Sequence, residues 1–375
     1  MRLKFFLLAL LISLIYYKPI YAQGDNNIKW FNPQANSYAT LKGKVWQNVD
    51  SVNYYARLPT GSEKDVRKEV WDLAKNTAGE YIDFSTTGQK IVVKYLLKGG
   101  KSLDNMPTLG VSGVDLYAED NYGNWHWMKA AYSYRDTVTY SYANFDQNVK
   151  IKKFRLYLPL YNTPKWLKIG VGVNDQFAVE EANDKTPLVF YGTSIMQGAS
   201  ASRPGMAWLN ILGRKLGLPV INLGFSGNGR LETPLIDLMN QTDAKLFVLD
   251  CQPNLHDKKV YPAEEIEKRI TASVQSLKTK HPNTPILLVE HSSGLTNVNL
   301  DTELTGRYIW TSQILYKTYQ KLKQSGVKDL YVLTAKEIGF TDNSTIDGTH
   351  PNDFGMMQYA DAYEKSIRKI LMDRK

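Results

Sequence analysis

The sequence predicts a two-domain protein, in which an all-β sandwich of the jelly-roll kind precedes an α/β domain with a parallel five-stranded sheet. From about residue 37 to residue 173, short β-rich segments are separated by Gly, Asn and Asp, a pattern typical of an antiparallel sandwich. After residue 186, short apolar runs alternate with longer helical patterns, which is typical of a parallel sheet covered on both faces. A polar connection at residues 174–186 separates the two patterns.

The composition agrees with two folded domains. The 375 residues are enough for two hydrophobic cores, and 43% hydrophobic and 22% charged residues are ordinary for a soluble globular protein. The net charge is +9, but Lys and Arg form no clustered stripe, so we expect no nucleic-acid partner. We predict a signal peptide at residues 1–22, the β-sandwich at 23–175 and the α/β domain at 176–375.

The first 22 residues have the pattern of a secretory signal. Arg2 and Lys4 precede an uncharged run at residues 5–17, and Ala22 offers a cleavage position before Gln23. The run is shorter than the roughly 20 apolar residues that span a bilayer, so we expect no stable membrane anchor. The sequence therefore predicts a secreted or periplasmic protein.

The sandwich is predicted from five β-rich segments and contains many aromatic residues. The expected strands lie at residues 81–84, 90–96, 137–142, 151–158 and 166–173, and a short helix is expected at 66–74. The aromatic residues include Trp46, Tyr54, Tyr55, Tyr117, Trp125, Trp127, Tyr132 and Tyr134. Two interpretations stay open: the rings fill the sandwich core, which aromatic preference for strands favours, or they stack on sugars.

The α/β domain is predicted from five apolar strands separated by helices. The strands are expected at residues 188–191, 220–223, 244–249, 285–289 and 330–333. Between the third and fourth strands, one apolar helical stripe consists of Ile266, Ile270, Val274 and Leu277. In sheets of this kind, the functional site lies at the carboxyl ends of the strands.

Candidate residues for the chemistry follow four of these strand ends. Ser194 follows the first strand in a strand-to-helix turn, Gly227 the second and Asn254 the third, while Asp347 and His350 follow the fifth. Each residue type is common in loops, but their joint placement indicates one site. A serine needs a base to become a nucleophile, an imidazole supplies one, and a carboxylate orients the imidazole.

These residue types suit ester hydrolysis through an acyl-enzyme. Ser194 is the predicted nucleophile, His350 the base and Asp347 its partner. The developing oxyanion needs aimed donors, for which we predict the backbone N–H groups of Ser194 and Gly227 and the side-chain amide of Asn254.

Other chemistries fit the sequence less well. Met196 occupies the place of the second glycine in Gly-x-Ser-x-Gly, and the close spacing of Asp347 and His350 is unlike that of a lipase-type α/β-hydrolase. The chain has no His-Glu-x-x-His or paired-cysteine motif, so we expect neither a metal nor another cofactor. Its one cysteine, Cys251, is expected to be a packed thiol.

Five short blocks resemble bacterial SGNH/GDSL-type hydrolases that carry an N-terminal GxDLY-type β-domain. The blocks are Gly113 to Tyr117 and residues 191–198, 222–227, 250–254 and 347–350. The first catalytic block departs from Gly-Asp-Ser-Leu at Thr193 and Ile195, and residues 250–254 keep only the asparagine of Gly-x-Asn-Asp. The resemblance implies a flavodoxin-like SGNH hydrolase domain and an esterase.

The resulting hypothesis is a secreted serine esterase that deacetylates carbohydrates, with an acetylated oligo- or polysaccharide as its substrate. The alternatives are a lipid or general short-chain acyl esterase, and a carbohydrate-binding protein with a degenerate hydrolase domain. His256 and Glu290 are expected as further substrate contacts, and a helix-cap or rim role for Glu290 remains open.

Overall fold

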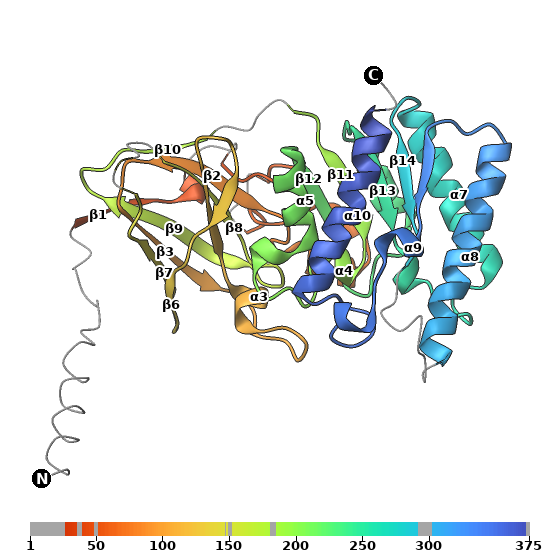
Figure 1. Cartoon of the computed structure of the whole chain (residues 1–375), viewed down its shortest axis with the longest axis horizontal. Coiled ribbons are helices and arrows are strands. Elements are labelled where there is room, and N and C mark those ends of the chain that lie inside the picture. Colours follow the sequence, from red (N-terminus) through yellow and green to blue (C-terminus); the bar gives the residue numbers. More distant parts are fainter. Residues whose placement is uncertain are drawn as a thin grey trace, which may run out of the picture.

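A computed structural model describes residues 27–35, 40–48, 52–146, 148, 152–180, 185–291 and 302–372. The predicted secretory signal at residues 1–22 lies outside these residues. Figure 1 shows the β-sandwich and the α/β domain side by side along the long axis. Among the described residues, no helix combines the length and the apolar character needed to cross a membrane.

The N-terminal half is an antiparallel sandwich, as the sequence predicts, and consists of two five-stranded sheets. The first sheet has the order β1 (Ile28–Phe31), β9 (Pro164–Gly172), β3 (Lys90–Leu97), β7 (Val138–Ala143) and β6 (Ala131–Tyr134). The second has the order β10 (Phe177–Val179), β2 (Tyr81–Thr86), β8 (Lys152–Tyr157), β4 (Asp115–Glu119) and β5 (Trp125–Trp127). The two short helices α2 (Lys68–Ala74) and α3 (Thr108–Ser112) lie outside the sheets.

The aromatic residues of this half divide between core and surface. Tyr54, Tyr55 and Tyr117 are buried, whereas Trp127 and Tyr132 have about half of their surface exposed, at 48% and 52%. The core interpretation therefore holds for Tyr54 and Tyr55, whereas Tyr117 is buried against Arg203 and Arg214 of the other half. The rings of Trp127 and Tyr132 are accessible from solvent.

The C-terminal half is a parallel sheet with the order β12 (Val220–Gly224), β11 (Leu188–Gly192), β13 (Leu246–Asp250), β14 (Ile286–Val289) and β15 (Leu330–Leu333). Its short helices are α4 (Ser194–Gln197), α6 (Thr233–Met239) and α9 (Ala335–Ile338), and its longer ones are α5 (Trp208–Leu216), α7 (Ala263–Lys280), α8 (Thr302–Gln324) and α10 (Asp353–Met372). The predicted α/β fold is confirmed.

Helices cover both faces of this sheet. The predicted stripe of α7 packs with α8 into one apolar core, and α5 packs with α10 into a second core on the opposite face. Because each of β11, β12 and β13 is buried along its whole length, these strands are mostly apolar without alternation, and the exceptions are the buried Asn222 and Asp250.

Strand β11 lies between β12 and β13, the strands that follow it in the chain. The chain therefore turns to opposite sides of β11, which makes its carboxyl end a topological switch point, the usual place of a site in such sheets.

Part of the N-terminal half shares a core with the α/β sheet. Ala56, Leu58, Val70 and Trp71 belong to the same buried cluster as residues of β11 and β12. The two halves are thus joined by apolar packing as well as by the chain connection.

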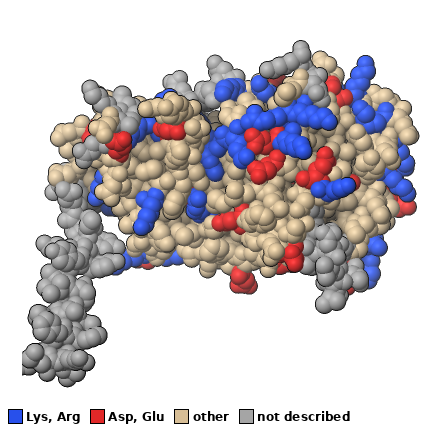
Figure 2. Space-filling model, in the orientation of Figure 1, with Lys and Arg blue, Asp and Glu red and all other residues tan. Residues whose placement is uncertain are grey.

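Charges on the face seen in Figure 2 are of both signs. Lys and Arg are interspersed with Asp and Glu there. Opposite charges also pair directly: Lys215 contacts Asp361 and Glu364 at 2.8 Å each.

Candidate active site

Ser194 lies at the switch point, at the start of a very short helix. Strand β11 ends at Gly192, Thr193 has an extended backbone, and Ser194 is the first residue of α4. The helix ends after one turn at Gly198, which has a left-handed φ of 106°. A side chain at Gly192 would collide with the carbonyl oxygen of Asp250 at 2.7 Å, so this strand end is tightly packed.

The structure brings Ser194, His350 and Asp347 together in one hydrogen-bonded series. Ser194 Oγ lies 2.9 Å from His350 Nε2, and His350 Nδ1 lies 2.7 Å from Asp347 Oδ2. Because the carboxylate can only accept, Nδ1 carries the proton and Nε2 presents its lone pair to the serine hydroxyl. Ser194 Oγ therefore has a base within hydrogen-bond distance.

Asp347 is held in its ionised form by the loop that follows it. The backbone N–H groups of Thr349 and His350 donate to Asp347 Oδ1 at 3.0 and 2.7 Å. Partial burial raises the pKa of Asp347, but the hydrogen bonds and the interaction with His350 outweigh burial and lower this pKa below its ordinary value. The group facing the imidazole is consequently a carboxylate.

Two contacts fix the loop that carries His350. Asp353, at the start of α10, accepts hydrogen bonds from the backbone N–H and the hydroxyl of Ser202 at 2.9 and 2.5 Å. The hydroxyls of Tyr308 and Thr349 lie 3.0 Å apart. The contact between Ser202 and Asp353 joins the segment after Ser194 to the segment after His350, although these segments lie far apart in the sequence.

Gly227 and Asn254 lie at the next two strand ends. Gly227 has φ of 69°, and no atom lies within 4 Å of the position that a Cβ would take. Asn254 Oδ1 accepts a hydrogen bond from the backbone N–H of Gly229 at 3.0 Å, so its Nδ2 remains as a donor. Gly229 in turn packs on the end of β11, because a Cβ there would meet Gly192 O at 2.2 Å.

Several side chains that support this site carried no signal in the sequence. Gln197 is fully buried and accepts from the backbone N–H of Ser226 at 3.0 Å, which fixes the segment before Gly227. The Tyr161 hydroxyl donates to the carbonyl oxygen of Ser194 at 3.3 Å. Gln197 lies within the block around Ser194, but only its burial distinguishes it from a surface glutamine.

The two further candidates have different surroundings. Glu290 Oε2 accepts from the backbone N–H of Ala335 at 2.9 Å, so the structure gives this carboxylate the helix-capping role, at the start of α9. His256 donates from Nδ1 to the carbonyl of Pro253 at 2.6 Å, which leaves Nε2 as an acceptor. A substrate contact by His256 stays a prediction.

His291, which follows the fourth strand next to Glu290, is buried beside the site. His291 packs edge-on against the Tyr308 ring with 4.1 Å between ring centroids. Burial, followed by the proximity of His350 and His256, lowers the pKa of His291 to about 3. His291 is therefore neutral at physiological pH and adds no charge next to His350.

Cys251 is unsuited to nucleophilic chemistry. Its side chain is 1% exposed, and burial raises the pKa of the thiol well above its ordinary value. Within the described ranges, no group of three or more His, Cys, Asp or Glu residues is arranged to hold a metal ion.

Each half of the chain matches a known protein family. Residues 185–368 match the GDSL-like lipase/acylhydrolase family, and residues 28–177 match the GxDLY family, described as the N-terminus of SGNH-hydrolase-type esterases. No curated protein sequence matches the chain.

Solved structures resemble the chain over nearly its whole length. A crystal structure from Bacteroides ovatus ATCC 8483, named as a GDSL-like lipase, has 32% sequence identity and a TM-score of 0.82, covering 92% of this chain and 98% of that one. The salicylyl-acyltransferase SsfX3 from a tetracycline biosynthetic pathway has 18% identity and a TM-score of 0.71, with 92% and 97% coverage. A family two carbohydrate esterase from Cellvibrio japonicus has 12% identity and a TM-score of 0.55, with 93% and 99% coverage. The last two are likenesses of fold.

Proposed function

Because the chain belongs to the GDSL-like lipase/acylhydrolase family and carries its GxDLY N-terminal domain, we propose that it is a secreted serine esterase that removes acetyl groups from carbohydrates. The observation that carries the esterase mechanism is the series Ser194–His350–Asp347, with contacts of 2.9 and 2.7 Å.

In the first step, Ser194 Oγ attacks the ester carbonyl. The O–H proton moves to His350 Nε2 as the new C–O bond forms, and Asp347 stabilises the resulting imidazolium. The tetrahedral intermediate then collapses. His350 returns the proton to the leaving alcohol oxygen, and the acyl group remains on Ser194.

The oxygen of the attacked carbonyl becomes negatively charged in this step. We assign three donors to it: the backbone N–H groups of Ser194 and Gly227 and the Nδ2 amide of Asn254. These donors suit the role because they are uncharged and so do not perturb the charge state of His350. The hydrogen bond from the Gly229 N–H to Asn254 Oδ1 orients the amide, because the oxygen faces Gly229 and the Nδ2 group is left to donate to the substrate.

In the second step, water replaces the alcohol. His350 removes a proton from the water as it attacks the acyl-enzyme, and the same donors stabilise the second tetrahedral intermediate. His350 then protonates Ser194 Oγ, which releases acetate and restores the site.

Two observations support a carbohydrate substrate. Trp127 and Tyr132 are half exposed on the β-domain, and flat aromatic faces of this kind stack well on sugar rings. Trp127 is held in place, because its Nε1 donates to Asp115 at 2.7 Å and the Arg203 guanidinium lies over its ring at 4.6 Å. Arg203 comes from the hydrolase domain, so this ring lies where the two halves meet. The likeness of fold to a family two carbohydrate esterase agrees with this assignment.

Acetate release from a panel of acetylated polysaccharides, compared with hydrolysis of p-nitrophenyl esters of increasing chain length, tests the proposal. We expect acetate release from at least one polysaccharide and a preference for the acetyl ester. Activity that rises with chain length would instead identify a lipid or general acyl esterase. Sugar binding without turnover of any ester would identify a carbohydrate-binding protein. Detection of the mature chain outside the cytoplasm tests secretion.

A further inference from the structure

The loop that carries Gly227 is held by an arginine from the other half of the protein. Arg67 precedes α2 and donates from Nη1 to Asn228 Oδ1 at 2.7 Å. The same guanidinium donates from Nε and Nη2 to the two carboxylate oxygens of Glu232, at 2.5 and 3.2 Å. Arg67 thus contacts the residue next to Gly227 and is itself fixed in orientation by a two-pronged ion pair.

Asn228 links Arg67 to the Ser226–Gly227 peptide. Its Nδ2 donates to the carbonyl oxygen of Ser226 at 2.8 Å. The described chain contains no cis peptide bond, and in a trans peptide the C=O and the N–H point in opposite directions. Because the Ser226 carbonyl is drawn toward Asn228, the N–H of Gly227 must point away from Asn228.

Gly227 has no side chain that could fix its peptide, and its own contact is at the carbonyl oxygen, which accepts from Arg230 Nε at 3.1 Å. A glycine with φ of 69° has no side chain to restrict its backbone, and nothing lies within 4 Å of where a Cβ would be. The N–H of Gly227 also has no hydrogen-bond partner in the part of the chain that the structure describes. The direction of this donor therefore depends on the neighbouring contacts.

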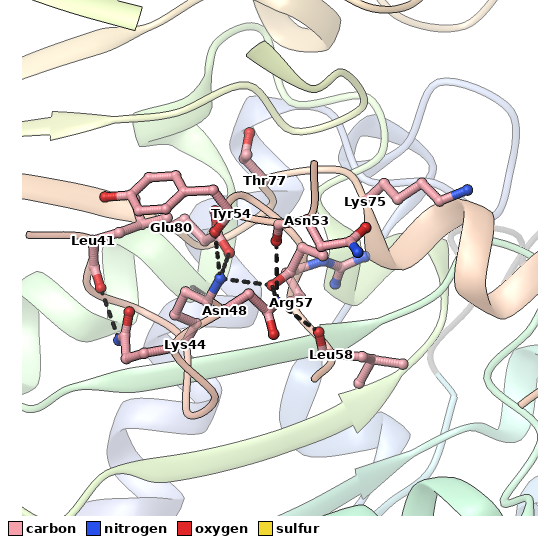
Figure 3. A network of polar contacts seen from close by, with 12 residues as sticks. Leu41, Lys44, Asn48, Asn53, Tyr54, Arg57, Leu58, Lys75, Thr77 and Glu80 are labelled. Atoms are coloured by element: carbon pink, nitrogen blue, oxygen red, sulfur yellow. Dashed lines mark hydrogen bonds and ion pairs between the residues drawn. The ribbon is translucent and has the colours of Figure 1, made fainter. Parts of the chain in front are cut away.

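The base of the same loop is fixed independently by Arg57. Its Nη1 donates to the carbonyl oxygens of Asn222 and Gly224, at 2.9 and 2.8 Å, at the end of β12. Figure 3 shows Arg57 in a buried polar network with Asn48, among other residues. Arg57 holds the strand end, and the backbone N–H of Asn228 closes a turn on the carbonyl oxygen of Phe225 at 2.8 Å. Within this turn, the Ser226–Gly227 peptide is further held by Arg67 through Asn228 and by the Gln197 contact to Ser226.

We propose that Arg67 is a positioning residue for ester hydrolysis: acting through Asn228, it directs the Gly227 N–H toward the oxyanion. This inference rests on the proposed function. It assigns the N-terminal half a part in the chemistry, because Arg67 lies in that half.

The test uses Arg67→Met in the full-length protein with p-nitrophenyl acetate. Misaligning one of three donors should lower kcat about tenfold while KM changes less than about twofold, because the donor acts mainly in the transition state. Arg67→Lys keeps one charged donor and should recover part of kcat. Glu69→Gln is the matched control, since Glu69 lies 3.4 Å from the same guanidinium but has no contact with the loop. Glu69→Gln should keep kcat within about twofold of the wild-type value.

A second readout separates positioning from a purely structural role. In binding a boronic acid, Ser194 Oγ adds to boron while its proton moves to His350, and the adduct is a tetrahedral anion that resembles the intermediate. The affinity of the enzyme for the boronic acid should fall in Arg67→Met by about the same factor as kcat. Asn228→Ala should show the same losses, and the double variant should show little further loss, because both residues act on one peptide.

Two results with an active wild-type enzyme would overturn the positioning role alone. In the first, Arg67→Met keeps the wild-type kcat. In the second, Arg67→Met loses kcat but binds the boronic acid with unchanged affinity. Additive losses in the double variant would also overturn it. A wild-type protein that hydrolyses no ester would overturn the proposed function, and this inference with it.

Discussion

The carboxylate of Asp353 accepts hydrogen bonds from both the backbone N–H and the hydroxyl of Ser202, at 2.9 and 2.5 Å. Ser202 lies shortly after the helix that begins with Ser194, and Asp353 lies three residues after His350. This pair therefore joins the segments that supply the nucleophile and the base. The distance between Ser194 Oγ and His350 Nε2 depends on how firmly these segments are held together.

Replacement of Ser202 tests this connection. Ser202→Ala removes the hydroxyl contact but keeps the backbone N–H, so we expect kcat for p-nitrophenyl acetate to fall about threefold to tenfold with a small loss of thermal stability. Steady-state kinetics and a melting curve measure both effects. A wild-type kcat would show that the backbone contact is sufficient.

Ser194→Ala tests the nucleophile. We expect no hydrolysis of a small chromogenic acetate ester above background, with an unchanged circular dichroism spectrum, because the hydroxyl hydrogen-bonds to His350 and not to the backbone of the helix. Retained turnover would remove Ser194 from the mechanism.

Asn254→Ala tests the side-chain oxyanion donor. Loss of one such donor should lower kcat by about 10²- to 10³-fold. The variant also leaves the Gly229 N–H without its acceptor, so thermal unfolding should be measured alongside. A near-normal rate in a folded variant would exclude the oxyanion role.

Two glycines of the same loop should respond differently to alanine. Gly229→Ala places a methyl group 2.2 Å from Gly192 O, and both stability and activity should fall because the strand end beneath Ser194 must shift. Gly227→Ala meets no atom within 4 Å and costs only the left-handed backbone, about 1 to 2 kcal/mol of unfolding free energy. Urea unfolding and kcat of the two variants provide the comparison. Equal losses would contradict the steric explanation.

Asp250 should make stability depend on pH. Burial raises the pKa of Asp250 to about 7, although the Tyr363 hydroxyl, which donates to Oδ2 at 2.8 Å, opposes the rise. Between pH 4 and pH 7 the folded protein keeps this proton while the unfolded chain releases it, so stability should decrease over this range and level off above it.

Asp250→Asn should abolish this pH-dependent loss. The amide oxygen can still accept from Tyr363, and no proton is exchanged on unfolding. The free energy of unfolding of the variant minus that of wild type should increase by about 1 to 3 kcal/mol from pH 5 to pH 8. Urea titrations at both pH values measure it, and parallel pH profiles for the two proteins would refute the assignment.

The sequence was most informative about the α/β sheet and the strand ends. Short apolar runs such as residues 246–249 favour a buried strand, and parallel strands separated by helices place their carboxyl ends at one edge. That physical constraint is why Ser194, Asn254 and His350 could be assigned to one site before any distance was known. The short strands β1, β5, β6 and β10 of the sandwich were missed, since three or four residues are too few to show alternation.

The supporting contacts depended on the tertiary structure. Arg67 and Asn228 are 161 positions apart, and their local sequences contain no feature that pairs them. Glu290 follows a strand end just as Asn254 does, yet its carboxylate caps α9 because the start of that helix happens to lie within reach.

The sequence by itself therefore determined the class of fold and the residue types available for catalysis, because periodicity and strand length are local properties of the chain. Only the tertiary structure decided which of these side chains contact one another and which hold the oxyanion loop, because hydrogen bonds between distant segments depend on how two separate cores pack together.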